Sequence, residues 1–113
     1  METKIKMLNM ELTDAIRQYV DERLLAISKI VDEYDPAVLV DVEVGKSTRH
    51  HNKGPYMRCE MNVVFLGNVF RGEEEREDLY EAIDTCKDDI RRQIVEHKER
   101  VKDEQRVPRP DKV

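Results

Sequence analysis

The spacing of apolar residues along the chain predicts two long helices. Between residues 16 and 34, and again from Glu77 to about Asp103, apolar side chains recur every three or four positions. This is the period of a helix that buries one face. The apolar positions are Ile16, Val20, Leu24, Ile27, Val31 and Tyr34 in the first helix, and Leu79, Ile83, Cys86, Ile90, Ile94, His97 and Val101 in the second.

Alternation of apolar and polar residues predicts strands before and between the helices. Residues 3–8 alternate weakly, and valine fills every second position from Val38 to Val44. A third run alternates from Tyr56 to Phe65, and Gly67-Asn68 is typical of a tight turn into a short strand at residues 69–71. An alternating pattern buries one face of a strand. We therefore expect four strands, the last two forming a hairpin.

Polar and proline residues mark the ends of the predicted helices. Thr13 or Asp14 can cap the first helix, and Asp35-Pro36 stops it. The last residues carry two prolines and no apolar period, so they cannot continue the second helix. The sequence predicts one domain over residues 1–104 and a short tail over residues 105–113.

The predicted order is strand, helix, three strands, helix. Two helices on one face of a four-stranded sheet would bury both apolar stripes and the inward strand residues. The fold class that we expect is α+β, a two-layer sandwich of β-α-β-β-β-α order.

Composition narrows the possible classes of protein. The chain has 113 residues, 39% hydrophobic and 40% charged, which suits one modest core under an ionic surface. No apolar run approaches the length of a membrane span, and the first residues lack a secretory signal pattern. We therefore expect a soluble, cytoplasmic protein without a membrane partner.

The sequence offers little for catalysis or metal binding. Cys59 and Cys86 fall in a predicted strand and helix, as buried thiols usually do. His50 and His51 are adjacent, so they point in different directions along an extended backbone and make a poor metal pair. The four glycines form no phosphate-binding motif. We expect no enzyme, no cofactor and no metal.

Charged residues are segregated along a chain whose formal net charge is −5. Residues 46–58 contain four basic residues and two histidines with no acid, and this predicted loop includes Arg49. Residues 73–78 contain five acids against Arg76 alone. Segregated charge favours a binding surface. The loop suits phosphate and sugar contacts, although an ordinary long hairpin loop is also possible.

A strip of mainly basic residues runs along one side of the second predicted helix. At about 100° per residue, Lys87, Arg91, Lys98 and Lys102 lie within about 60° of one another, beside the apolar stripe. Asp84 falls in the same sector. The strip is therefore either a polyanion-binding surface or a solvated face with ion pairs inside the helix.

Two segments resemble the ribosome hibernation-promoting factor and ribosome-associated translation inhibitor family. The first is Glu11-Leu12-Thr13-Asp14-Ala15-Ile16-Arg17-Gln18-Tyr19-Val20 with Arg23-Leu24, and the second is Glu77-Asp78-Leu79-Tyr80-Glu81-Ala82-Ile83-Asp84. The second continues into Arg92-Gln93-Ile94 and His97-Lys98. With the order of elements, the resemblance spans residues 4 to 102.

The resemblance implies a fold akin to double-stranded RNA-binding domains and a partner, the small ribosomal subunit. It implies that the chain contacts 16S ribosomal RNA where messenger and transfer RNA would pass, and so inhibits translation without chemistry. DNA is not an expected partner, and a monomer is expected off the ribosome. The family's basic positions match Arg17, Arg23, Arg92, His97, Lys98 and Arg100 here, to which the strip and loop add Lys87, Arg91, Lys102 and Arg49.

Two departures and two alternatives accompany the resemblance. Asp89 and Glu96 stand where relatives often carry lysine, which reduces the expected basic surface. One alternative is a general binder of double-stranded RNA. The other is a protein-interaction module whose acidic cluster at residues 73–78 meets a basic partner.

Overall fold

The computed structural model describes residues 1–47 and 56–106. Within them the chain forms the expected order of elements, so the predicted α+β class is confirmed. The elements are β1 (Glu2–Leu8), α1 (Asp14–Val31), β2 (Leu39–Lys46), β3 (Met57–Phe65), β4 (Asn68–Arg76) and α2 (Leu79–Arg106).

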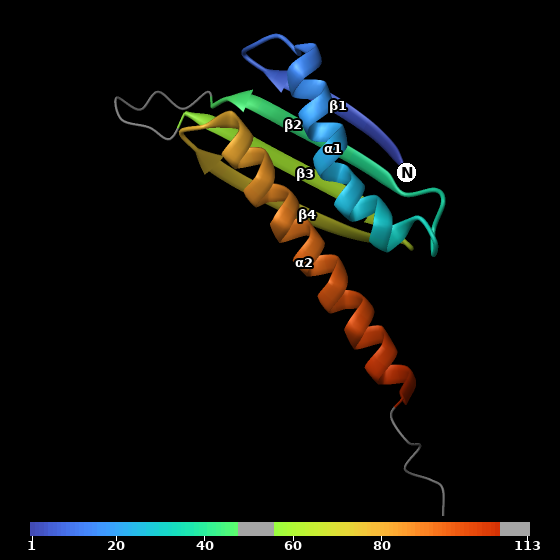
Figure 1. Ribbon diagram of the computed structural model, residues 1–113. Coiled ribbons are helices and arrows are strands. Elements are labelled where there is room, and N and C mark those ends of the chain that lie inside the picture. Colours follow the sequence, from blue (N-terminus) through green and yellow to red (C-terminus); the bar gives the residue numbers. More distant parts are fainter. Residues whose placement is uncertain (48–55, 107–113) are drawn as a thin grey trace, which may run out of the picture.

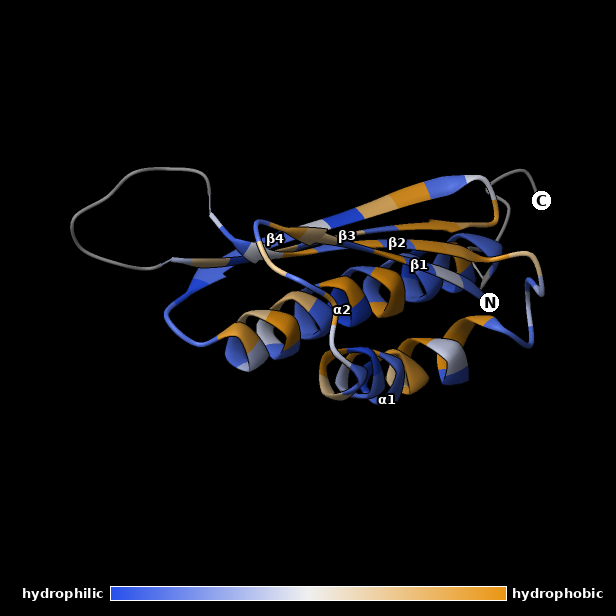
Figure 2. Ribbon diagram, turned by 90° about the horizontal axis from the view of Figure 1, so that it is seen from above, coloured by the Kyte–Doolittle hydropathy of each residue, from blue (hydrophilic) through white to orange (hydrophobic). Residues whose placement is uncertain are grey.

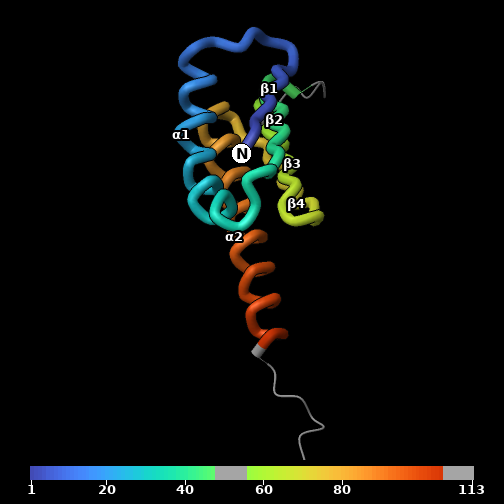
Figure 3. Tube along the Cα trace, turned by 90° about the vertical axis from the view of Figure 1, so that its right-hand side faces the viewer, coloured from blue at the N-terminus to red at the C-terminus, as the bar shows by residue number. Residues whose placement is uncertain are grey.

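The four strands form one mixed sheet in the order β1-β2-β3-β4. The β1 strand pairs with β2 in parallel, and the other neighbours are antiparallel. Both helices lie on the same side of the sheet, and the other side is open (Figures 1 and 3). A parallel pair needs a crossover between its strands, and α1 supplies it.

The hydrophobic core lies between the sheet and the two helices, which form two layers (Figure 2). Its strand side chains come from alternate positions, as the sequence predicted for Val40, Val42 and Val44. One glycine is required here, because a β-carbon at Gly45 would lie 2.2 Å from the carbonyl oxygen of Leu8. The buried side chains of α1 are Ile16, Val20, Leu24, Ile27 and Val31, and those of α2 are Leu79, Ala82, Ile83, Cys86, Ile90 and Ile94.

Helix α1 is shorter than its apolar pattern predicted. Thr13 caps it, because its side-chain oxygen accepts a hydrogen bond from Ile16 N at 3.1 Å. The helix ends at Val31, and Tyr34 lies in the turn that follows with 55% of its surface exposed. The expectation that Tyr34 belongs to the buried stripe is wrong, because the chain leaves the helix before Tyr34 can face the core.

The turn between β3 and β4 lies one residue earlier than predicted. Leu66 and Gly67 both have positive φ, 49° and 78°, as a two-residue hairpin turn with its right-handed twist requires. Phe65 therefore pairs with Asn68, and β4 extends to Arg76 instead of ending at residue 71. Glu73, Glu74 and Glu75 of the acidic run thus lie in a strand.

Helix α2 is anchored at its start and projects at its end. The carboxylate of Asp78 accepts a hydrogen bond from Tyr80 N at 3.0 Å, and the helix runs to Arg106, two residues into the expected tail. Its last turns extend past the sheet (Figures 1 and 3). Val101 is consequently 39% exposed, so its expected place in the packed stripe is wrong. Residues 107–113 lie outside the described residues.

Candidate nucleic-acid interface

A polar cluster joins the two helices near their N-terminal halves. The Tyr19 hydroxyl donates a 2.6 Å hydrogen bond to the carboxylate of Asp84, and Arg23 Nε donates to the other oxygen at 2.8 Å. The Arg23 guanidinium lies 4.0 Å from the centre of the Tyr19 ring. The hydrogen bond to Asp84 raises the pKa of Tyr19 above its usual value. Arg23, a predicted RNA-binding residue, therefore also links α1 to α2.

One member of the predicted basic strip of α2, Lys98, contacts α1. Its four members share a sector of the helix with Asp84, which contacts α1 directly. Lys98 Nζ donates a 2.9 Å hydrogen bond to the carbonyl oxygen of Ile30 and lies 4.3 Å from the centre of the Tyr34 ring. Lys87 is ion-paired with Asp88. Two members of the strip are thus held by intramolecular contacts.

Arg91 and Lys102 are the unpaired members of this strip. Both side chains are exposed, and neither forms an ion pair with another described residue. They extend along the same side of α2 as Lys98, one before it and one after it. A cation without an internal partner keeps its full attraction for a phosphate. This group of Arg91, Lys98 and Lys102 is called the helix flank below.

Other predicted residues lie on a different side of α2. Arg92 is about 120° around the helix from Lys98, and it is ion-paired with Asp89 and with Glu96, 3.4 Å away. Arg100 is exposed, and no ion pair joins it to the described residues. The His97 ring packs edge-on against Phe70, with ring centres 5.4 Å apart. These residues do not continue the helix flank.

Arg17 and Arg49 are also separate from the helix flank. Arg17 is exposed on α1, about 120° around the helix from Arg23 and so away from α2. It borders a shallow depression that also contains Asp14, Asp21 and Glu22. Arg49 lies outside the described residues, as do His50 and His51. The structure brings together part of the predicted set and disperses the rest.

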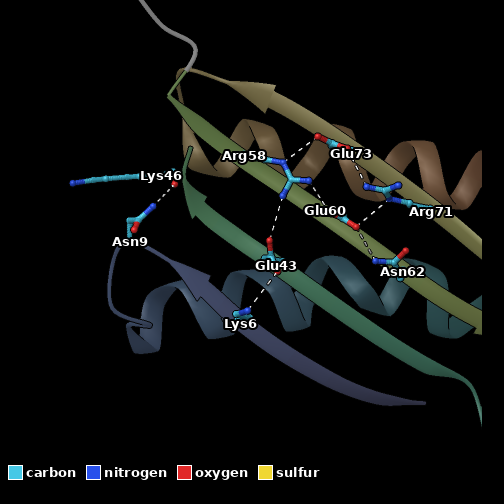
Figure 4. A network of polar contacts seen from close by, with 9 residues as sticks. All are labelled: Lys6, Asn9, Glu43, Lys46, Arg58, Glu60, Asn62, Arg71 and Glu73. Carbon is cyan, nitrogen blue, oxygen red and sulfur yellow. Dashed lines mark hydrogen bonds and ion pairs between the residues drawn. The ribbon is translucent and has the colours of Figure 1, made fainter. Parts of the chain in front are cut away.

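The open sheet face carries an ion-pair network that sequence reasoning missed (Figure 4). Arg58, in β3, contacts the carboxylates of Glu43 at 3.4 Å, Glu60 at 2.6 Å and Glu73 at 3.0 Å. Arg71 contacts Glu60 and Glu73 as well. Arg58 was counted with the basic loop, but three carboxylates surround it. It is therefore unavailable for a phosphate.

The network has a measurable electrostatic consequence at Glu60. Hydrogen bonds from the Asn62 amide and the Arg58 guanidinium lower the pKa of Glu60 to about 2, against the opposing effect of burial. This carboxylate accordingly stays ionised in mild acid. The signal that could have found the network is the cross-strand register, which places Glu60 opposite both Glu43 and Glu73.

Most acidic side chains of the cluster at residues 73–78 already form ion pairs or hydrogen bonds within the protein. Glu73 binds Arg58 and Arg71, and Glu74 lies 3.0 Å from Arg76. Asp78 caps α2. An acidic protein-docking site at this cluster would have to break these contacts first.

The two cysteines are buried side chains of the core, one in β3 and one in α2. A hydrogen bond with Cys86, together with burial, raises the pKa of the Cys59 thiol far above its usual value. A thiol in this state is a poor nucleophile. Among the described residues no group of His, Cys, Asp or Glu side chains is arranged to hold a metal, and none of the helices could cross a membrane.

The similarity to known proteins covers nearly all of the described strands and helices. Residues 3–102 match the model of the family described as Sigma 54 modulation protein / S30EA ribosomal protein. A ribosome hibernation promotion factor from Deinococcus radiodurans is 30% identical over 104 residues, which are 91% of this chain and 52% of that protein. A ribosome hibernation promoting factor from Azotobacter vinelandii is 29% identical over 97% of this chain and 94% of its own length.

A solved structure agrees with these relatives. The N-terminal domain of Thermus thermophilus Protein Y superposes with a TM-score of 0.66 at 32% identity, covering 83% of this chain and 96% of that domain. The chain spans about half the length of several curated relatives that it matches. The resemblance found in the sequence is confirmed by the family match over residues 3–102, and the chain belongs to the Sigma 54 modulation protein / S30EA ribosomal protein family.

Proposed function

We propose that the chain binds the small ribosomal subunit through 16S rRNA, fills the channel for messenger and transfer RNA, and thereby inhibits translation. The protein acts in the cytoplasm, as a monomer when off the ribosome, and without a catalytic step. The similarity to ribosome hibernation promotion factors supports the ribosome as partner.

The observation that carries the proposal is the helix flank. Arg91 and Lys102 form no ion pair with another described residue. Most of the other described arginines contact carboxylates, namely Arg23, Arg58, Arg71, Arg76 and Arg92. RNA binding draws its affinity from cations that neutralise phosphates. Arg91 and Lys102 are thus two free cations, with Lys98 between them, and they supply a phosphate-binding edge on an otherwise acidic protein.

A general double-stranded RNA binder remains the second candidate, because such proteins recognise the shape and phosphates of a duplex with a similar two-layer fold. The two functions differ in the partner that binds more tightly. A ribosome-specific factor prefers the assembled small subunit, whereas a duplex binder holds naked RNA equally well.

Cosedimentation tests the proposal. The chain is mixed with purified small subunits, large subunits or a naked RNA duplex at salt concentrations from about 50 to 200 mM. We expect it to pellet with small subunits, and its affinity should fall by about tenfold to a hundredfold across this range if roughly three phosphates are contacted. Equal binding to the duplex would support the second candidate, and a salt-independent affinity would exclude the phosphate-binding model.

A further inference from the structure

Exposed apolar side chains gather at one end of the molecule. Of the nine large apolar residues that are exposed among the described ones, six lie where α1 and β3 end and where β2 and β4 begin, or on the projecting part of α2. Scattered exposed apolar residues are ordinary, but a contiguous group marks an interaction site. These six residues are called the apolar end: Tyr34, Leu39, Val64, Leu66, Val69 and Val101.

Strand register makes part of the apolar end continuous. On the open sheet face Leu39 pairs with Val64, and Val64 pairs with Val69, so the three side chains form a row across β2, β3 and β4. They are 45%, 37% and 67% exposed. The row therefore presents an apolar ridge that the helices do not cover.

A groove continues this ridge around the hairpin turn. It has a volume of about 530 Å³ and lies between the β3–β4 turn and the projecting part of α2. Tyr34, Leu66 and Val101 line it, and Lys98 and Lys102 stand at its side. The apolar end thus combines a ridge with an adjoining groove.

Leu66 is placed at a cost to the backbone. Its φ of 49° is disfavoured for residues with a β-carbon, and asparagine or glycine is the usual choice at such a turn. The turn is also held in place, because Asp35 Oδ2 accepts a hydrogen bond from Leu66 N at 2.9 Å while its other oxygen accepts one from Ala37 N. An exposed leucine is thus fixed where folding alone favours a polar residue.

Size and charge restrict what could cover the apolar end. Its exposed area is on the order of a few hundred Å², below the roughly 800 Å² that each partner buries in a standard interface. On the same face the carboxylates of Glu43, Glu60 and Glu73 are already paired with Arg58 and Arg71, so this network has no free charge with which to hold a second copy. A second copy is therefore a poor occupant.

RNA is also a poor occupant. Bases stack on aromatic faces, whereas five of the six residues are aliphatic and one side of the only ring, Tyr34, is already contacted by Lys98. The nearby Arg58 and Arg71 are paired with carboxylates and are not free to bind phosphates. Aliphatic side chains suit the apolar side chains of a protein segment instead.

We propose that the apolar end docks a short apolar segment of a ribosomal protein. This inference rests on the proposed function for its source of partner. It assigns RNA contacts to the helix flank and protein contacts to the adjoining apolar end.

The first test replaces Leu66 with asparagine and uses Leu25→Asn as the control, because both leucines are 56% exposed. Asparagine tolerates positive φ, so Leu66→Asn should fold and melt like the parent. Its affinity for purified ribosomes should fall by about tenfold, as the loss of a half-exposed leucine from an interface predicts. Leu25→Asn should bind as the parent does. Equal binding by Leu66→Asn overturns the proposal.

The second test identifies the partner directly. Val69 is replaced by the photo-reactive residue p-benzoylphenylalanine, and the full chain is irradiated on purified ribosomes. We expect a cross-link to a ribosomal protein; a cross-link only to rRNA, one to a second copy, or none at all overturns the proposal. A parent chain that binds no ribosome overturns the proposed function as well, whereas selective failure at Leu66 and Val69 overturns only the docking surface.

Discussion

The open sheet face and the helix flank both carry arginine or lysine, but in opposite electrostatic states. On the sheet face Arg58 and Arg71 each contact at least two carboxylates. On the helix flank Arg91 and Lys102 contact none among the described residues. A polyanion-binding site therefore cannot be identified from the number of basic residues alone, because only unpaired cations remain free to attract a ligand.

Reversing the free cations should have the largest effect. The double variant Arg91→Glu, Lys102→Glu exchanges two phosphate attractions for repulsions on an exposed surface, so the fold should survive and the affinity for the small subunit should fall by about a hundredfold. Cosedimentation measures the affinity, and circular dichroism checks the fold.

Reversing the charge of two lysines away from the helix flank provides the matched control. Lys4→Glu with Lys6→Glu changes two exposed lysines on β1, one of which lies 4.0 Å from Glu43. Binding should change by less than about threefold, because these lysines are remote from the helix flank. Equal losses in both double variants would mean that net charge, and not position, governs binding.

The substitution Arg58→Met should destabilise the ion-pair network on the open sheet face. Only 17% of the Arg58 side chain is exposed, and its loss leaves the carboxylates of Glu43, Glu60 and Glu73 facing one another without a cation. We expect a loss of about 1 to 3 kcal/mol in the free energy of unfolding, measured by urea denaturation. Ribosome binding by the folded variant should persist; if binding disappears with stability unchanged, Arg58 belongs to the interface.

Acid below about pH 4.5 should weaken the ion-pair network of the open sheet face and leave the basic side chains charged. The pKa of Glu60 is lowered from 4.5 to about 2 on folding, so its ionised form stabilises the protein above pH 4.5. That contribution, at most roughly 3 kcal/mol for such a shift, is lost as the pH falls from about 4.5 toward 2. Thermal melts of the parent should decline across this window more steeply than those of Glu60→Gln, and parallel curves would contradict the assignment.

The smallest effect is expected at the polar cluster between the helices. Asp84→Asn removes the charge that binds Arg23 and Tyr19, but all three side chains are partly exposed, so stability should fall by no more than about 1 kcal/mol. Tyrosine titration followed by absorbance should show a lower pKa for Tyr19, because Asp84 raises it in the parent. An unchanged titration would show that the contact is not formed in solution.

Local patterns predicted most of the fold. The valines of β2 and the spacing from Ile16 to Val31 or from Leu79 to Ile94 report burial directly, because one face of each element packs on the core. The extension of β4 was missed, since Gly72 and the four charged residues after it give no apolar alternation. Those residues are held in the strand by pairing with β3, which is a nonlocal effect.

The candidate site was less predictable than the fold. Helical spacing correctly placed Lys87, Arg91, Lys98 and Lys102 in one sector with Asp84, but it could not reveal which of them would find an internal partner. That outcome depends on α1, since Ile30 lies 68 positions from Lys98. Short-range sequence patterns carry no information about such contacts.

The parallel pairing of β1 with β2 has a consequence for the order of folding. Glu2 meets Leu39 only after the α1 crossover has closed, whereas Phe65 and Asn68 meet across a two-residue turn. Closing the longer loop costs more chain entropy, so the β3–β4 hairpin should form earlier and β1 should dock late. For the same reason β1 is the strand whose amide protons should exchange with solvent first, while α2 and the hairpin remain protected.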